Sequence, residues 1–227
     1  MWMDILQLRD WYRTRSGRVA RRVLQGYLDA RLPDMAGPHM LTLGYAAPFL
    51  KNLEEEPFVF CAMPAQMGVC HWPREGRSKS LLVWEGQLPY SDDSLDFIFI
   101  IHAIEFTADA EKMLEECWRV LRPDGRLLIM APNRTGAWAR KEGSPLARGR
   151  PFSARELDKL LRRCDFVVTH CTYALYTPPT VRTWLLRYAG VFEKIGQRWS
   201  PAVGGMLVME GRKDVFGGRV VRVSRNP

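Results

Sequence analysis

Polar side chains capable of chemistry follow the apolar stretches of this chain, at points where buried strands would end. His102 comes directly after the run 96–101, and Asn133 follows a second apolar run at 126–130. Open α/β sheets bind ligands at the carboxyl ends of their strands, so an imidazole there can contact a ligand or take part in proton transfer. A histidine that only forms a hydrogen bond at a strand end is an equally good interpretation. His102 is therefore a candidate catalytic residue.

The stretch 88–133 contains the elements that would position these side chains. Residues 96–101 are apolar almost throughout, which is typical of a strand covered on both faces. From Thr107 to Leu121 apolar residues recur at intervals of three and four, and this spacing predicts an amphipathic helix. A turn at 123–125, with the sequence Pro-Asp-Gly, separates that helix from a strand at 126–130. Strand, helix and strand in this order predict one crossover unit of a parallel sheet.

Short motifs in the same stretch resemble those of class I S-adenosylmethionine-dependent methyltransferases of the small-molecule type, the type 11-like group. They are Leu88-Pro89-Tyr90, Ser94-Leu95-Asp96, Arg119-Val120-Leu121-Arg122-Pro123-Asp124-Gly125 and Pro132-Asn133-Arg134. The resemblance covers residues 38–135 closely and the flanks only in layout, and the motifs are specific in combination. It implies an α/β fold with a Rossmann-like, doubly wound, seven-stranded sheet that is mostly parallel, with the last strand antiparallel. It also implies S-adenosyl-L-methionine as the cofactor and methyl transfer as the reaction.

The flanking sequence supplies the other elements of this layout. One or two helices are expected within 1–31, and further helices at 153–164 and 178–196. Strands are expected at 40–43, 58–61, 80–84, 166–173 and 205–210. Ser153 and Glu156 predict a capping box at the start of the helix 153–164. We expect a single methyltransferase-like domain over 1–227, with an N-terminal helical segment at 1–37, a cofactor-binding half at 38–135, and a substrate-side half with a basic tail at 136–227.

The loop after the first predicted strand departs from the family pattern. Family members carry several glycines there, whereas Gly44-Tyr45-Ala46-Ala47-Pro48 keeps only the first. Alanine is the next smallest residue, so the loop can still allow close approach of a ligand to the backbone. Pro48 suits the first turn of a following helix. The resemblance therefore implies cofactor contacts from Gly44, Tyr45 and Ala46.

Two further departures concern the ribose and the adenine. Family members place an Asp or Glu after the second strand to bind the ribose hydroxyls, but residues 61–66 contain no carboxylate. We expect this loss to weaken cofactor binding by about 1–3 kcal/mol. Met63 is expected to pack against the adenine or ribose. Trp84, Glu85 and Gln87 follow the third strand, where the adenine is contacted; Trp84 can stack on the base, while Glu85 is equally well interpreted as a plain turn carboxylate.

The resemblance also implies roles on the acceptor side. Tyr12, from the N-terminal helix, is expected to cover the cofactor, and His102 to lie beside the sulfonium or the acceptor. Asn133, Arg134 and Trp138 are candidates for binding an acceptor that carries phosphate or carboxylate, with a surface loop of solvated charges as the alternative. No catalytic dyad is required, because methyl transfer depends mainly on the alignment of the reacting atoms.

Composition limits the environment and the partners. The net charge is +8, from 33 basic and 25 acidic side chains, so RNA is a candidate partner, although the N-terminal arginines also fit the solvated face of a helix. No apolar run approaches the roughly 20 residues of a membrane span, and no secretory signal is recognisable at the N-terminus. We therefore expect a cytoplasmic protein. The five cysteines include no closely spaced pair, which predicts free thiols and no metal site.

Two functions remain open at this point. The first is methyl transfer to an unidentified small molecule, RNA or protein. The second is a methyltransferase-like scaffold or regulatory binding partner that has lost the cofactor. The retained small residues after Gly44 favour the first. A small activator protein or a homodimer contact that orders the N-terminal helix can compensate for weak cofactor binding.

Overall fold

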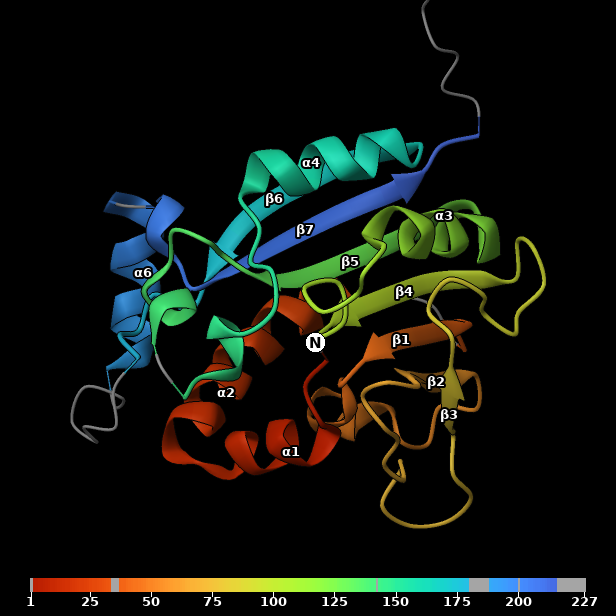
Figure 1. Ribbon diagram of the computed structural model, residues 1–227, viewed down its shortest axis with the longest axis horizontal. Helices are drawn as coiled ribbons and strands as arrows, with labels where there is room; N and C mark the ends of the chain where they lie inside the picture. Colours follow the sequence, from red (N-terminus) through yellow and green to blue (C-terminus); the bar gives the residue numbers. More distant parts are fainter. Residues whose placement is uncertain (1, 34–36, 142, 180–187, 200, 216–227) are drawn as a thin grey trace, which may run out of the picture.

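The computed structural model describes residues 2–33, 37–141, 143–179, 188–199 and 201–215. Seven strands form a sheet in the order β3-β2-β1-β4-β5-β7-β6 (Figure 1). Strand β7 runs antiparallel to both of its neighbours, and the other pairings are parallel. This confirms the predicted mixed sheet. The strands are β1 (Met40–Gly44), β2 (Val59–Pro64), β3 (Ser80–Val83), β4 (Leu95–Ile101), β5 (Leu121–Pro132), β6 (Phe166–Ala174) and β7 (Met206–Lys213).

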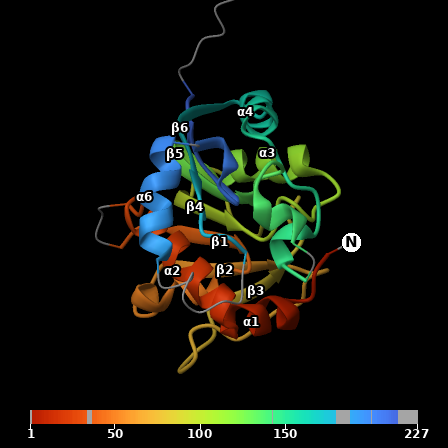
Figure 2. The ribbon, with the colours of Figure 1, turned by 90° about the vertical axis from the view of Figure 1, so that its left-hand side faces the viewer.

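Helices cover both faces of the sheet (Figure 2). One face carries α1 (Ile5–Arg13), α2 (Arg15–Asp29) and α6 (Ala189–Trp199), and the other carries α3 (Ala110–Val120) and α4 (Ala154–Arg163). Short 3₁₀ turns lie in the connections: η1 (Ala47–Phe49), η2 (Lys51–Leu53), η3 (Ala137–Arg140), η4 (Pro145–Ala147) and η5 (Pro201–Val203). The helix predicted at 178–196 corresponds in part to α6, while residues 180–187 lie outside the described residues.

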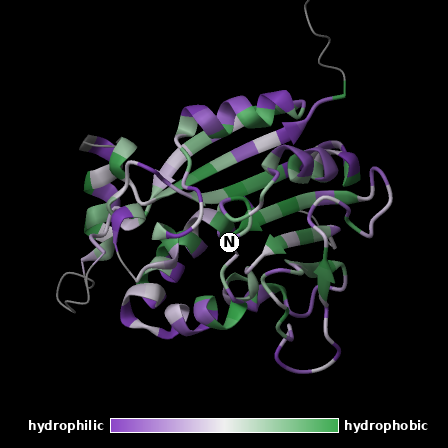
Figure 3. Cartoon of the chain, in the orientation of Figure 1, coloured by the Kyte–Doolittle hydropathy of each residue, from purple (hydrophilic) through white to green (hydrophobic). Residues whose placement is uncertain are grey.

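The core consists of two apolar layers, one on each side of the sheet. Along β4, Phe97 and Phe99 point into the layer beneath α1 and α2, whereas Ile98 and Ile100 point into the layer beneath α3 and α4. Figure 3 shows the central strands as the most hydrophobic part of the chain and the outer faces of the helices as hydrophilic. Each fully buried side chain of this size contributes about 1.5–3 kcal/mol to folding. The predicted strand at 96–101 is therefore buried on both faces, as its sequence indicated.

A polar network ties the turn before β4 to helix α3. The Arg119 guanidinium donates to the carbonyl oxygens of Leu88 (3.2 Å) and Tyr90 (3.0 Å), and Glu116 accepts from both Arg119 and the Leu88 amide. Asp92 forms a further ion pair with Arg119. Several residues of the 88–133 motifs therefore have a role in the fold itself.

The connection between β1 and β2 differs from the expectation. Pro48 does not begin an α-helix, since only the 3₁₀ turns η1 and η2 follow β1. Eight residues separate Pro48 from Pro57, which is short for a stable helix, and α2 already covers this face of the sheet. Strand β2 also continues past Cys61 to Pro64, so Cys61 lies within the strand rather than at its end.

Candidate functional site

Strands β1 and β4 bring Gly44 against the backbone that leads into His102. Gly44 pairs with Ile101, and its φ of +101° is a conformation that side-chain-bearing residues rarely adopt. A Cβ atom on Gly44 would overlap the carbonyl oxygen of Ile101 and lie 3.1 Å from the carbonyl carbon of His102. The next amide, that of Tyr45, donates to the same Ile101 oxygen at 3.1 Å. The glycine is therefore required by the packing of the two strand ends.

A buried polar cluster lies at this end of β4, formed by Tyr12, His102 and Glu105. The Tyr12 hydroxyl lies 2.7 Å from His102 Nε2, and His102 Nδ1 lies 3.3 Å from Glu105 Oε1. The three residues are 5%, 0% and 2% exposed. Burial raises the pKa of the Tyr12 hydroxyl well above its ordinary value, so the phenol keeps its proton and can donate it to Nε2.

Two members of this cluster have buried polar atoms without a hydrogen-bond partner. The two carboxyl oxygens of Glu105 make no hydrogen bond to any residue that the structure describes, and the same holds for the Nδ1 atom of His102. His102 also has a φ of 56°, which is unusual for a residue other than glycine. Unpartnered buried polar groups and left-handed backbone both cost free energy, and such features concentrate at functional sites.

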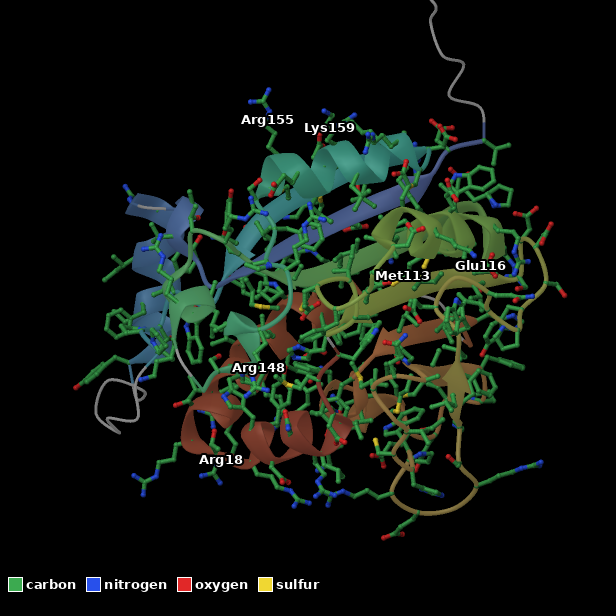
Figure 4. The ribbon with its side chains drawn as sticks, viewed as in Figure 1. Arg18, Met113, Glu116, Arg148, Arg155 and Lys159 are labelled. Carbon is green, nitrogen blue, oxygen red and sulfur yellow. The ribbon has the colours of Figure 1, made fainter. Side chains whose placement is uncertain are left out.

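Helix α1 closes the end of the sheet over this cluster. It is held by a hydrogen bond from the Ile5 amide to the Met67 carbonyl (3.0 Å) and by one from Arg148 to the Gln7 side chain (3.3 Å). In Figure 4 the labelled Arg148 lies between the loop after β5 and the N-terminal helices. The Tyr12 ring packs edge-on against Phe49, with centroids 5.5 Å apart and planes at 88°.

Closure buries the residues that the sequence assigned to the cofactor on this side of the sheet. Tyr45 is 4% exposed, and Ala46 and Met63 are fully buried. The Met63 sulfur accepts a hydrogen bond from the Cys70 amide at 3.4 Å. A ligand can reach these residues only if α1 moves and Tyr12 leaves its position.

The residues after β3 are more accessible. Trp84 is 59% exposed, and Gln87 is also exposed. Glu85 is largely buried and accepts a hydrogen bond from the Thr107 hydroxyl at 3.1 Å, which joins the loop after β3 to the loop after β4.

The three candidate acceptor residues after β5 are engaged in holding loops together. The Asn133 amide donates to the carbonyl oxygens of Ala202 (2.9 Å) and Gly204 (2.6 Å). Arg134 pairs with Glu156 at 2.8 Å, and the buried Trp138 indole donates to the Thr177 carbonyl at 2.7 Å. These contacts account for all three residues structurally, and their role toward an acceptor stays a prediction.

The residues at this end of the sheet fit S-adenosylmethionine in part. Trp84 offers an aromatic face, and Glu85 supplies a carboxyl group that can accept from ribose hydroxyls. The position of an added Cβ at Gly44 is filled by the Ile101 carbonyl oxygen, so this glycine serves the packing of the strands. The stretch 64–67 after β2 contributes no carboxylate. The fit therefore depends on the loop after β3 and on an open position of α1.

Two cavities elsewhere in the described residues include none of the predicted site residues. One, of about 560 Å³, lies between α2 and α6 and is lined by Val23, Tyr27 and Glu193 among others. The other, of about 350 Å³, lies between the start of α3 and α4, beside Arg150 and Lys159. The described residues also contain no group of three His, Cys, Asp or Glu side chains placed to hold a metal ion. None of the helices in the described ranges is long and apolar enough to cross a membrane.

Glu105 was not among the residues predicted from the sequence. Its signal was its position three residues after His102, in the segment that follows β4. The sequence could not reveal that the segment turns back, so that the two side chains face each other in the interior.

Comparison with known proteins gives matches to methyltransferases over part of the sequence. A family model described as a methyltransferase domain matches residues 74–129. A probable S-adenosylmethionine-dependent methyltransferase of Mycolicibacterium smegmatis is 36% identical over 84 residues, covering 36% of this chain and 32% of that protein. The chain spans only about a third to three fifths of the length of the curated relatives that it matches first, with 32%, 59% and 53% of their lengths covered.

Solved structures share the architecture at low sequence identity. A methyltransferase structure from Thermotoga maritima is 21% identical with a TM-score of 0.65, over 91% of this chain and 94% of that one. A chain from the complex of the Haloferax volcanii Trm112 methyltransferase activator with a methyltransferase is 18% identical with a TM-score of 0.60, over 91% and 97% of the two chains. At these identities the structural matches establish the fold alone.

Proposed function

We propose that this chain, whose sequence and fold match those of S-adenosylmethionine-dependent methyltransferases, transfers a methyl group from S-adenosylmethionine to an acceptor. When bound, the cofactor supplies an electrophilic methyl group on a sulfonium centre. The protein's own task is then to bind and align the two partners and to exclude water.

The observation that carries this proposal is the buried pair His102 and Glu105 at the end of β4. Glu105 has no hydrogen-bond donor among the described residues, and His102 adopts left-handed backbone. A protein that used this fold only as a scaffold would gain stability from apolar side chains at both positions. Retention of the pair at the edge where α/β sheets bind ligands supports a functional site.

We assign cofactor binding to the loops after β1 and β3. Gly44, Tyr45 and Ala46 would lie against the methionine portion of the cofactor, and Trp84, Glu85 and Gln87 against the nucleoside. Met63 would pack between them and His102 would border the transferred methyl group, while Tyr12, displaced from His102, would cover the cofactor. The closed α1 implies that binding is coupled to movement of this helix.

The acceptor class stays open between small molecules, RNA and protein. Asn133, Arg134 and Trp138 border the acceptor side in this proposal, and the net charge of +8 favours an anionic acceptor such as RNA. A small activator protein or a homodimer contact that orders the N-terminal helix is a further part of the proposal, and the likeness to a chain from the complex of the Trm112 activator with a methyltransferase supports it. We also infer a cytoplasmic protein acting as one domain over 1–227.

Titration calorimetry with S-adenosylhomocysteine tests the proposed cofactor site. Wild-type protein is expected to bind, and Glu85→Gln to bind at least about tenfold more weakly, because a hydrogen bond to a charged group contributes about 1.5–3 kcal/mol. Glu115→Gln, an exposed glutamate on α3, is the matched control and should bind like wild type. No binding by wild type at millimolar ligand, with and without cell extract, would contradict the proposal.

The scaffold function has specific support as a second candidate. The site is closed by Tyr12, the ribose carboxylate is absent after β2, and Arg119 and Asn133 already serve the fold. Incubation of methyl-labelled cofactor with the protein and with separated RNA, protein and metabolite fractions distinguishes the two functions. Label in one fraction would support methyl transfer and identify the acceptor class, whereas label in none would support the scaffold.

A further inference from the structure

We propose that His102 and Glu105 form a proton-accepting pair for an aromatic hydroxyl group, and that Tyr12 occupies the place of this hydroxyl in the closed structure. The proposal rests on the proposed methyl transfer, since it makes the acceptor a phenol and the reaction an O-methylation. Within it, His102 is the catalytic residue and Glu105 is a positioning residue.

The two ring nitrogens of His102 face different partners. Nε2 lies 2.7 Å from the Tyr12 hydroxyl, and Nδ1 lies 3.3 Å from Glu105 Oε1. A neutral imidazole carries one N–H. Nδ1 has no hydrogen bond in the closed structure, and its 3.3 Å contact with Glu105 Oε1 is an ion-pair contact once the ring is charged. When the single proton is on Nδ1, Nε2 is left as the acceptor for the phenolic O–H. In this proposal Glu105 orients the general base by accepting from Nδ1 when the acceptor is bound.

Tyr12 is suited to standing in for a ligand because it comes from the N-terminal helix. Glu105 and His102 belong to the well-packed end of β4, while the described polar links between α1 and the body of the protein include the Ile5 amide and the Gln7 side chain. A phenol that only filled space would need no carboxyl group behind the histidine. The unpartnered oxygens of Glu105 are accounted for if the carboxyl group acts when His102 takes up a proton.

The walls around Tyr12 define the ligand as a flat ring. Phe49 meets the Tyr12 ring edge-on at 5.5 Å, and Tyr45 lies 6.1 Å away with planes at 41°. The Trp11 ring packs beside the Tyr12 ring, with the two ring centroids 4.8 Å apart. When Tyr12 withdraws with α1, the Phe49 and Tyr45 faces stay on the body of the protein and can receive another aromatic ring.

The proton balance of the step is complete without another reactant. The acceptor oxygen gives its proton to His102 Nε2 and forms a bond to the methyl carbon, while the carbon–sulfur bond breaks and leaves its electron pair on sulfur. The imidazolium that results has Nδ1 3.3 Å from Glu105 Oε1, and the carboxylate stabilises the positive charge in the buried site. Solvent takes up the proton after the product leaves and before α1 closes again.

The test uses the full chain with Tyr12→Ala and p-cresol, which has the shape of the missing side chain. We expect p-cresol to raise the melting temperature of this variant and to shift the ¹⁵N resonance of His102 Nε2. Toluene, which lacks only the hydroxyl, should bind at least tenfold more weakly. The chain has four histidines, so His102→Gln in the same background assigns the signal. Equal binding of toluene, or an unmoved His102 resonance, would overturn the proposal.

A second variant covers the case in which Tyr12→Ala does not fold. Tyr12→Phe keeps the ring and removes the hydroxyl, so the Nε2 resonance should move relative to wild type while Nδ1 stays protonated. Adding Glu105→Gln should then raise the population of the Nε2–H tautomer, whereas Glu115→Gln, exposed on α3, should not. An unchanged tautomer ratio in Glu105→Gln would remove Glu105 from the pair.

Methyl transfer separates this inference from the proposed function. With labelled cofactor, Tyr12→Ala should convert p-cresol to its methyl ether, and Tyr12→Ala/His102→Gln should lose at least 90% of that rate. If S-adenosylhomocysteine and p-cresol both bind but no ether forms, the phenol inference is wrong and the cofactor site stands. If p-cresol binds and shifts the His102 Nε2 resonance but S-adenosylhomocysteine does not bind at all, the proposed methyl transfer is wrong, and the O-methylation of a phenol is wrong with it.

Discussion

At the scale of single residues, Gly44 has two separable requirements. Its φ of +101° disfavours any side chain, and a Cβ atom would also overlap the Ile101 carbonyl oxygen. Both requirements hold without a cofactor. A glycine after the first strand is therefore weaker evidence for cofactor binding than the family pattern implies, and loss of binding in a Gly44 variant would not by itself locate the pocket.

Gly44→Ala tests this steric account. We expect a loss of about 2–4 kcal/mol in the free energy of unfolding, measured by urea denaturation, because strain and overlap add. Gly76→Ala is the control, since Gly76 has a φ of +82° but nothing within 4 Å of an added Cβ. It should lose only about 1 kcal/mol. Equal losses would mean that the Ile101 contact is unimportant.

The predictability of the site differs among its residues. His102 could be predicted because it follows an apolar strand directly, and its place at the strand end follows from local sequence. Its partners could not be found in the same way. Tyr12 reaches it from 90 positions earlier in the chain, and Glu105 from a turn whose direction depends on packing.

At the scale of elements, the unit from β4 to β5 is specified by local signals. The apolar run and the three-and-four spacing of α3 appear in the structure at the predicted places. The turn predicted at 123–125 is wrong as a boundary, because these residues lie within β5, where Asp124 has a φ of 63° and the pairing with β4 shifts register between Leu95 and Phe97. The capping box of Ser153 and Glu156 is likewise present at the start of α4. The connection after β1 was mispredicted because the N-terminal helices, distant in sequence, cover the face where a helix was expected.

Helix α3 is anchored to the turn before β4 through Glu116, whose side chain is only 12% exposed. Its hydrogen bond with Arg119 lowers the pKa of this carboxyl group below the ordinary 4.5. A folded-state pKa below the unfolded one means that the contribution to stability is present above about pH 4.5. It is lost as the pH falls through the folded-state value.

Glu116→Gln is therefore expected to be less stable than wild type by about 1–2 kcal/mol at pH 7, because the charged partner of Arg119 is lost. The difference should shrink steadily as the pH falls below about 4.5. Urea denaturation at pH 7 and at several values between pH 4.5 and 3 measures both effects. Glu115→Gln, exposed on the same helix, should change little at either end of this range. A difference independent of pH would mean that packing, not charge, explains the effect.

At the scale of the whole molecule, the arrangement of α1 decides whether the end of the sheet is accessible. The mixed seven-stranded sheet with its antiparallel last strand could be predicted, because the resemblance to methyltransferases implies it. The closure of this end of the sheet by α1 could not be predicted, because it depends on how α1 and the loop carrying Arg148 pack over β1 and β4. The hydrogen bond from Tyr12 to His102 is one contribution to the closed state.

Weakening closure should strengthen cofactor binding. When only the open state binds, the apparent dissociation constant equals the intrinsic one divided by the open fraction. Removing one net hydrogen bond of about 1 kcal/mol with Tyr12→Phe should tighten S-adenosylhomocysteine binding by about fivefold, as measured by calorimetry. Tyr27→Phe is the matched control, because the Tyr27 hydroxyl on α2 donates to the Tyr173 carbonyl (3.1 Å) and not to the cluster at the end of β4. Unchanged or weaker binding in Tyr12→Phe would mean that the hydroxyl serves the bound state rather than closure.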